Sequence, residues 1–164
     1  MSSIIFRPGM RTYFIPFVAG VVLAASAFLP WVIVGGVPMK GVPDFTGLWI
    51  LGLGAAATLL AILSLITRKN SRHPLLLVGL IALGIMFLSW RILPRTAGEH
   101  ALTVSQAFAI VENTPMSAPP SSIVGVGIYV GLVASAVLVL FGLTIVVKRV
   151  AKPYVIPSPD DDVE

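Results

Sequence analysis

The stretch AFLPWVIVGGVPMKGVPDFTGLW, residues 27–49, begins in one apolar run and ends in another. Pro30 interrupts the first run, because proline lacks a backbone N–H and kinks or ends a helix. Gly35 and Gly36 follow, and a glycine pair is typical of a tight two-residue turn. The stretch therefore predicts a turn between two membrane-spanning helices, with a small hairpin that has Val32 to Val34 as one arm.

The composition around this turn is that of a membrane protein. Of the 164 residues, 57% are hydrophobic and 11% are charged, and the mean hydropathy is +0.98. A helix needs about 20 apolar residues to cross a hydrocarbon core of ~30 Å. Four nearly uncharged runs reach this length, and they predict an all-α integral membrane four-helix bundle with spans at residues 13–34, 47–67, 74–93 and 123–147.

Basic residues predict how the chain is oriented, because lysine and arginine favour the cytoplasmic side of a membrane. One side carries Lys40, Arg91 and Arg95. The other side carries the remaining eight basic residues, which are Arg7, Arg11, Arg68, Lys69, Arg72, Lys148, Arg149 and Lys152. We therefore expect both termini in the cytoplasm, in a bacterial cytoplasmic membrane. Because the basic residues are scattered around the span ends, we expect them to face lipid headgroups and not nucleic acid.

The start of the chain allows an alternative, a cleavable signal peptide with Ala25-Ser26-Ala27 as its cleavage site. Apolar residues continue past Ala27 to Val34, which favours an uncleaved first span.

Small residues at helical spacing predict close contacts between helices. They form three faces, at Gly20 and Ala24 on the first span, Gly52 and Ala56 on the second, and Gly127, Gly131 and Ser135 on the fourth. The face on the fourth span fits contacts inside the protein's own bundle or contacts with a helix of a partner.

Residues near the span ends predict anchoring at the membrane interface, where tryptophan and basic side chains are enriched. These residues are Trp31, Trp49, Trp90 and Arg91. Arg91 is the only charged residue inside a predicted span, and it fits a side chain that extends to the interface or one that contacts an anionic partner group.

The outer loop between spans three and four predicts a short amphipathic helix at residues 103–113. Thr103 and Gln106 have the spacing of a capping box. Apolar residues recur at helical spacing, at Val104, Ala107, Phe108 and Val111. Such a helix fits the headgroup layer, a cap on the bundle or a partner subunit, and we expect the hairpin to pack beneath it.

The C-terminal tail, residues 152–164, ends in an acidic cluster. It fits a solvated end or a docking segment for a basic surface.

The chain offers few groups for catalysis. It has no cysteine, no carboxylate inside a predicted span and no H-E-x-x-H motif. His73 and His100 are the only candidate ligands for a haem or chlorophyll metal, and both lie at or beyond span ends. We therefore expect no enzyme activity and no metal or cofactor, with bound lipid expected and a pigment as the open alternative.

The Pro30-Trp31 pair near the end of the first span and the glycine-rich turn resemble small four-span bacterial integral membrane proteins of unassigned function. The resemblance implies the architecture and transfers no functional residue. Packing faces without a reactive cluster predict an accessory or scaffold subunit of a larger respiratory, photosynthetic or secretory membrane complex, with lipids and other integral membrane subunits as partners. The alternative is a small homo-oligomeric channel or transporter in which the Gly131 face joins the protomers.

Overall fold

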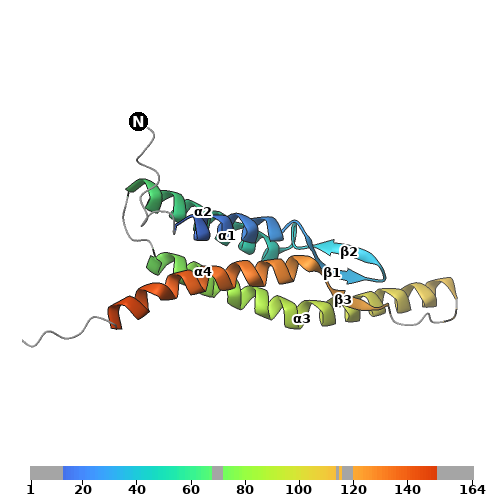
Figure 1. Cartoon of the computed structure of the whole chain (residues 1–164). Coiled ribbons are helices and arrows are strands. Elements are labelled where there is room, and N and C mark those ends of the chain that lie inside the picture. Colours follow the sequence, from blue (N-terminus) through green and yellow to red (C-terminus); the bar gives the residue numbers. More distant parts are fainter. Residues whose placement is uncertain (1–12, 68–71, 114, 116–119, 151–164) are drawn as a thin grey trace, which may run out of the picture.

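The computed structural model describes residues 13–67, 72–113, 115 and 120–150, and it is mostly helical, as predicted. Four helices run alternately in opposite directions along one axis (Figure 1). They are α1 (Phe14–Ser26), α2 (Phe45–Thr67), α3 (Arg72–Glu112) and α4 (Val126–Val150). Of these, α2, α3 and α4 are long and apolar enough to cross a membrane, whereas α1 has 13 residues. Arg7, Arg11, residues 68–71 and the acidic tail lie outside the described residues.

The helices pack as two closely joined pairs. The most extensive contacts are between α1 and α2 and between α3 and α4, and α1 also packs on α4. Helices α2 and α3 also contact each other, but less extensively than those pairs. Side chains in the shared core are fully buried, and they include Leu23, Ile50, Leu75, Met86, Ile128 and Leu138.

A small antiparallel sheet closes one end of the bundle (Figure 1). Strand β1 (Pro30–Val34) lies between β2 (Val37–Lys40) and β3 (Ser122–Val124). The predicted hairpin is confirmed, and Gly35 and Gly36 form its turn with φ values of 56° and 84°. These left-handed values suit glycine, because a Cβ makes them unfavourable. Strand β3 was not predicted, and it takes up the first residues of the expected fourth span.

The first helix is shorter than the predicted span at residues 13–34. It ends at Ser26, and the backbone N–H groups of Ala27, Phe28 and Leu29 form the closing turn with carbonyls of the last helical residues. The residue before a proline is disfavoured in the helical conformation, so the helix has to stop before Pro30. The apolar run continues beyond this point as strand β1, because buried strands and buried helices share an apolar composition.

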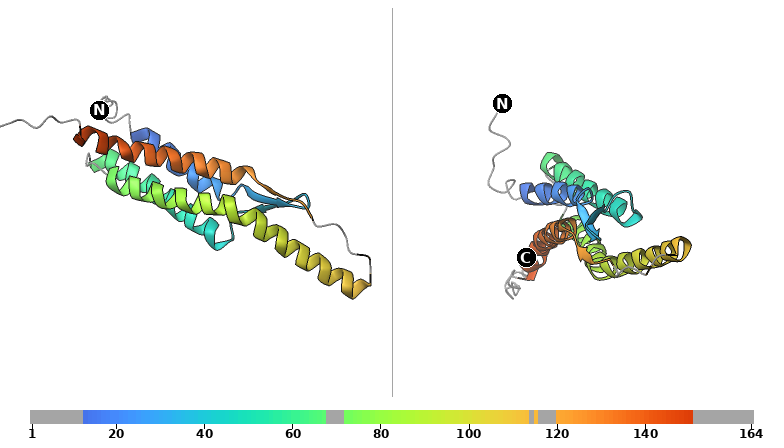
Figure 2. Two further views of the ribbon diagram at one scale, coloured as in Figure 1. Left: turned by 90° about the horizontal axis from the view of Figure 1, so that it is seen from below. Right: turned by 90° about the vertical axis from the view of Figure 1, so that its right-hand side faces the viewer.

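The predicted separate amphipathic helix is instead the second half of α3, which has 41 residues and contains Pro94. The Thr103 hydroxyl donates to the Glu99 carbonyl at 2.9 Å inside this helix, so Thr103 does not cap a helix. A proline inside a helix removes one hydrogen bond and bends the axis without always ending it. Figure 2 shows the yellow half of α3 leading away from the bundle axis. The helix ends before Asn113, whose φ of 50° is typical of the residue after a helix.

Glycines allow α1 and α2 to approach closely. A Cβ built on Gly54 would lie 2.5 Å from the backbone nitrogen of Ala24, and one on Gly20 would lie 2.6 Å from the Thr58 hydroxyl oxygen. Gly54 belongs to a stripe of buried residues on α2 that recur every three or four positions, namely Gly47, Ile50, Gly54, Ala57, Ala61 and Ser64. Gly52 is off this stripe, and no described atom lies within 4 Å of a Cβ built there.

We predict opposite effects of alanine at these two glycines. In Gly54→Ala the added methyl group would collide with the backbone of Ala24 and push α1 and α2 apart. This change should lower the free energy of unfolding by about 1–3 kcal/mol. Gly52→Ala should leave it unchanged or raise it by up to about 1 kcal/mol, because alanine favours helix more than glycine does. Unfolding in detergent, followed by circular dichroism, measures both. Equal destabilisation by the two variants would contradict the packing of α1 on α2.

Candidate functional site

Trp31, expected to be exposed as an interface anchor, is buried in the core at the junction of the sheet and the bundle. Its side chain is 1% exposed, and its indole N–H donates to the Ser26 carbonyl at 2.9 Å. A bulge between Pro30 and Val32 breaks the regular alternation of the strand, so Trp31 and Val32 are both buried. The indole fills space left by Gly41 and Gly127, where added Cβ atoms would lie 2.4 Å and 2.7 Å from it.

The other predicted anchors lie on the outer surface of the helices. Trp49 is 52% exposed and packs edge to face on Phe45, with ring centroids 6.0 Å apart. Trp90 is half-buried beside Phe87, and Arg91 is exposed. Their positions are compatible with anchoring.

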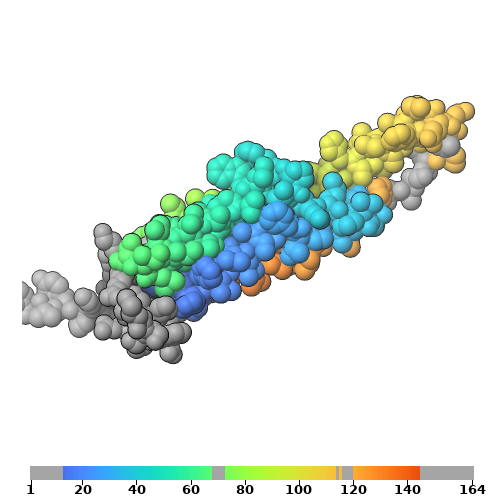
Figure 3. All heavy atoms as spheres, turned by 90° about the horizontal axis from the view of Figure 1, so that it is seen from above, coloured from blue at the N-terminus to red at the C-terminus, as the bar shows by residue number. Residues whose placement is uncertain are grey.

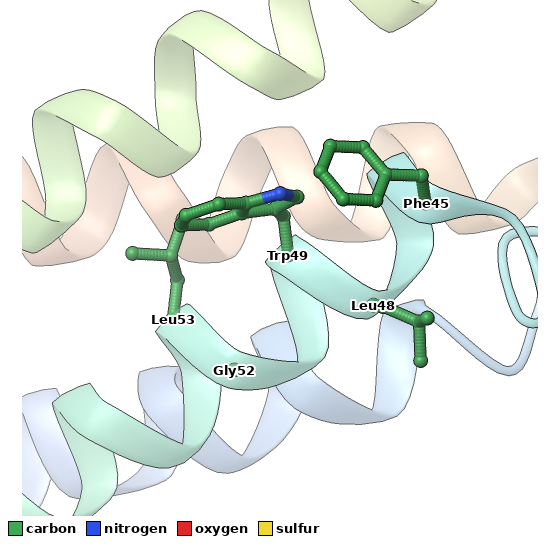
Figure 4. A pocket seen from close by; sticks show the side chains of 5 residues that line it. All are labelled: Phe45, Leu48, Trp49, Gly52 and Leu53. Carbon is green, nitrogen blue, oxygen red and sulfur yellow. The ribbon is translucent and has the colours of Figure 1, made fainter.

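An open apolar groove of about 360 Å³ lies beside Trp49 on α2. Figure 4 shows the rings of Phe45 and Trp49 on one side of the helix, with Gly52 leaving the helix surface bare next to Leu53. Gly52 is exposed and packs on no other helix among the described residues, because it points in nearly the opposite direction to Gly54. Ala56 is half-buried, and the contact with α1 is made by Gly54 instead.

The small-residue face of α4 is used inside the chain. A Cβ on Gly131 would meet the Met86 methyl group of α3, and one on Gly127 would lie 2.7 Å from the Trp31 ring. Ser135 is buried, and its hydroxyl donates to the Leu132 carbonyl at 2.9 Å. On α1, Gly20 is buried and Ala24 is half-buried against α2. The face proposed to join protomers in a channel is thus already occupied.

The second half of α3 leaves the bundle with apolar side chains exposed. In Figure 3 its yellow residues extend beyond the hairpin and away from the body of the molecule. Val104 is 51% exposed, Phe108 61% and Val111 83%, and Ala107 beside them is also exposed. We call Val104, Ala107, Phe108 and Val111 the outer stripe. The hairpin packs on the same helix slightly earlier, and its contact residues there are Leu93, Thr96, Ala97 and His100. They lie on the face that the outer stripe continues.

A cavity of about 270 Å³ lies where the hairpin meets α3. Its floor is apolar, and its rim carries Lys40 and Asp44 from the hairpin side and Thr96 and His100 from α3. The only ion pair among the described residues joins Arg95 and Glu99, so neither Lys40 nor Asp44 is paired. No local sequence pattern predicts this polar cavity, because its residues come from the hairpin region and from α3, which lie far apart in the sequence.

The two histidines lie far apart. His73 is exposed at the start of α3, and His100 is exposed 27 residues later, roughly 40 Å along the helix. They cannot ligate one metal together. Within the described ranges, no three histidine, aspartate or glutamate side chains gather as a metal site.

Comparison with protein-family models, with curated proteins and with solved structures found no match for this chain.

Trp31 and Trp49 give a matched test of the junction. Trp31→Phe removes the hydrogen bond to Ser26 and leaves a cavity between Gly41 and Gly127, so we expect the free energy of unfolding to fall by about 1–3 kcal/mol. Trp49→Phe changes an exposed ring and should stay within about 0.5 kcal/mol of the wild type. Unfolding in detergent checks both values. A larger loss of unfolding free energy in Trp49→Phe than in Trp31→Phe would contradict the role of Trp31 at the junction.

Proposed function

We propose that the protein is an accessory subunit of a membrane complex, with four membrane-crossing segments, both termini in the cytoplasm and the outer half of α3 as the contact for another subunit. The observation that carries this proposal is the outer stripe on a helix that extends beyond the bundle.

The length of α3 supports this arrangement. Its 41 residues measure ~60 Å, about twice the ~30 Å hydrocarbon core of a membrane. The apolar first half matches one crossing, and the second half, with Arg95, Glu99 and His100, then lies outside the membrane. An exposed large apolar side chain loses about 1.5–3 kcal/mol relative to burial. A subunit that covers Val104, Phe108 and Val111 therefore gains part of that energy on binding.

The surface of α1 supports a fourth crossing despite its length. Thirteen residues of helix reach only ~20 Å, but β1 extends the apolar chain beyond Ser26. The exposed side chains of α1 are all apolar, at Phe14, Ile15, Val18, Val21, Ala25 and Val22. Such a surface favours lipid over water as its surroundings.

The absence of cysteine from the sequence permits a direct test of the orientation. We expect Val37→Cys, in the hairpin, to react with a membrane-impermeant maleimide in intact spheroplasts. Ser158→Cys, in the C-terminal tail, should react only after the membrane is permeabilised. The unmodified chain is the control and should not be labelled. The reverse pattern would overturn the proposed orientation, and labelling at both sites in intact spheroplasts would overturn the even number of crossings.

The partner contact predicts the effect of a charge on the outer stripe. Phe108→Asp places a carboxylate in the proposed interface, and we expect it to reduce the amount of co-purified membrane protein at least tenfold at native expression, about 1.4 kcal/mol. Quantitative mass spectrometry after mild detergent extraction provides the measurement.

Gln106→Asp is the matched control, because it adds the same charge to the same helix about 160° away from Phe108. It should leave co-purification unchanged. If the wild-type chain purifies alone, or if both variants lose partners equally, the outer stripe is not a subunit contact.

A further inference from the structure

We propose that the cavity between the hairpin and α3, together with the groove between α2 and α3, binds one phospholipid with a zwitterionic ethanolamine headgroup. This inference rests on the membrane placement in the proposed function, and it does not depend on the accessory role.

The cavity and the groove adjoin each other. The cavity under the hairpin is lined by Leu93, and Leu93 also lines an apolar groove of about 300 Å³ between α2 and α3. From Leu93 the groove follows α3 back to Ile85, eight residues or about 12 Å of helix. One leaflet of a membrane has a hydrocarbon depth of about 15 Å, half of the ~30 Å core. The groove therefore accommodates the glycerol backbone and the upper part of one acyl chain.

The weak contact between α2 and α3 explains why this groove exists. These two helices touch less extensively than the other neighbouring pairs, and the groove walls carry exposed Leu88 and Ile92. A flexible acyl chain fills such a space without requiring a specific shape. Apart from Thr46 and Ser89 the walls are apolar, so they favour an acyl chain over a polar ligand.

The charges at the cavity rim select the headgroup. Lys40 and Asp44 line the same cavity, and neither forms an ion pair with another described residue. A phosphoethanolamine group carries one negative and one positive charge, so its phosphate matches Lys40 and its ammonium matches Asp44. An anionic glycerol headgroup also matches Lys40 but places no positive charge near Asp44. The rim therefore favours the zwitterionic lipid.

A buried hydroxyl lies where the glycerol backbone of that lipid would sit. Ser89 is 4% exposed and lines the groove one helical turn, about 6 Å, from Leu93. The hydroxyls of the buried serines Ser26 and Ser135 donate to carbonyls of their own helices, whereas the Ser89 hydroxyl has no hydrogen-bond partner among the described residues. Buried polar groups are almost always bonded. An ester carbonyl just below the phosphate would accept this bond.

Native mass spectrometry of the full chain in detergent tests the site with phosphatidylethanolamine and phosphatidylglycerol at equal concentration. We expect the wild type to retain more phosphatidylethanolamine, by roughly two- to fivefold, the effect of one exposed charge pair. Asp44→Asn should remove that preference by weakening phosphatidylethanolamine binding alone. Glu99→Gln, an exposed carboxylate outside the cavity, is the matched control and should preserve the preference. Equal retention of both lipids by the wild type, or a preference unchanged in Asp44→Asn, would overturn the headgroup assignment.

Two further measurements test whether the groove between α2 and α3 holds the acyl chain and whether the ligand is a lipid. Ser89→Ala should lower binding of both lipids by roughly fivefold, as for one hydrogen bond, without lowering the stability of the lipid-free protein. Ile92→Trp fills the groove and should also weaken both lipids, while Leu80→Trp, exposed elsewhere on α3, should not. Unchanged binding in Ser89→Ala and Ile92→Trp would overturn the groove as the site. Competition by water-soluble glycerophosphoethanolamine at the same concentration would show a site for a soluble phosphodiester and overturn a lipid.

The outcomes separate this inference from the accessory role. Lipid binding is measured on the isolated chain, and partner binding is measured by co-purification with Phe108→Asp. If the lipid-binding result is not obtained, the partner-binding result still stands, and the reverse also holds.

Discussion

The buried indole of Trp31 joins the helices to the hairpin at one end of the molecule, and the rest of the fold depends on this junction. Its N–H bonds to the Ser26 carbonyl at the end of α1, a position where helical carbonyls lack partners within the helix. Its ring occupies the space next to Gly41, which leads into α2, and next to Gly127, in the first turn of α4. One side chain thus joins the end of α1, the end of the hairpin and the first turn of α4. A larger residue at either glycine would collide with the ring, so Trp31, Gly41 and Gly127 form one packing unit.

Much of this arrangement follows from the sequence because apolar run length and turn chemistry act locally. The predicted second span at residues 47–67 nearly coincides with α2, and the Gly35-Gly36 turn forms as its residues require. The contact made by Gly54 could also have been found, since Gly47, Gly54 and Ala61 recur on one face of α2 at helical spacing. Gly52 and Ala56 have helical spacing as well, but Gly52 lies on the opposite side of α2.

The remaining features depend on contacts between distant parts of the chain. Strand β3 forms because Ser122 to Val124 pair with Val34 to Val32, and no local pattern marks a three-residue strand at the start of an apolar helix. Trp31 looks like an interface residue until the bulge in β1 turns it inward. Pro94 predicts the end of a helix on propensity alone, yet the apolar and amphipathic stretches on its two sides continue as one helix. The polar cavity arises in the same way, from residues about 50 positions apart that the hairpin brings together.

The hairpin also determines where the outer half of α3 points. Proline weakens a helix at one position, so the direction of the segment beyond Pro94 would vary if nothing held it. Strand β3 braces that position, because the Ser122 hydroxyl donates to the Pro94 carbonyl and a Cβ on Gly98 would lie only 3.3 Å from the Ser122 Cβ. The brace acts through the sheet, since β3 is paired to β1 and β1 is anchored by Trp31. The outer stripe is therefore held at a fixed orientation to the bundle, and in the proposed subunit contact this orientation lowers the entropy that would be lost on association.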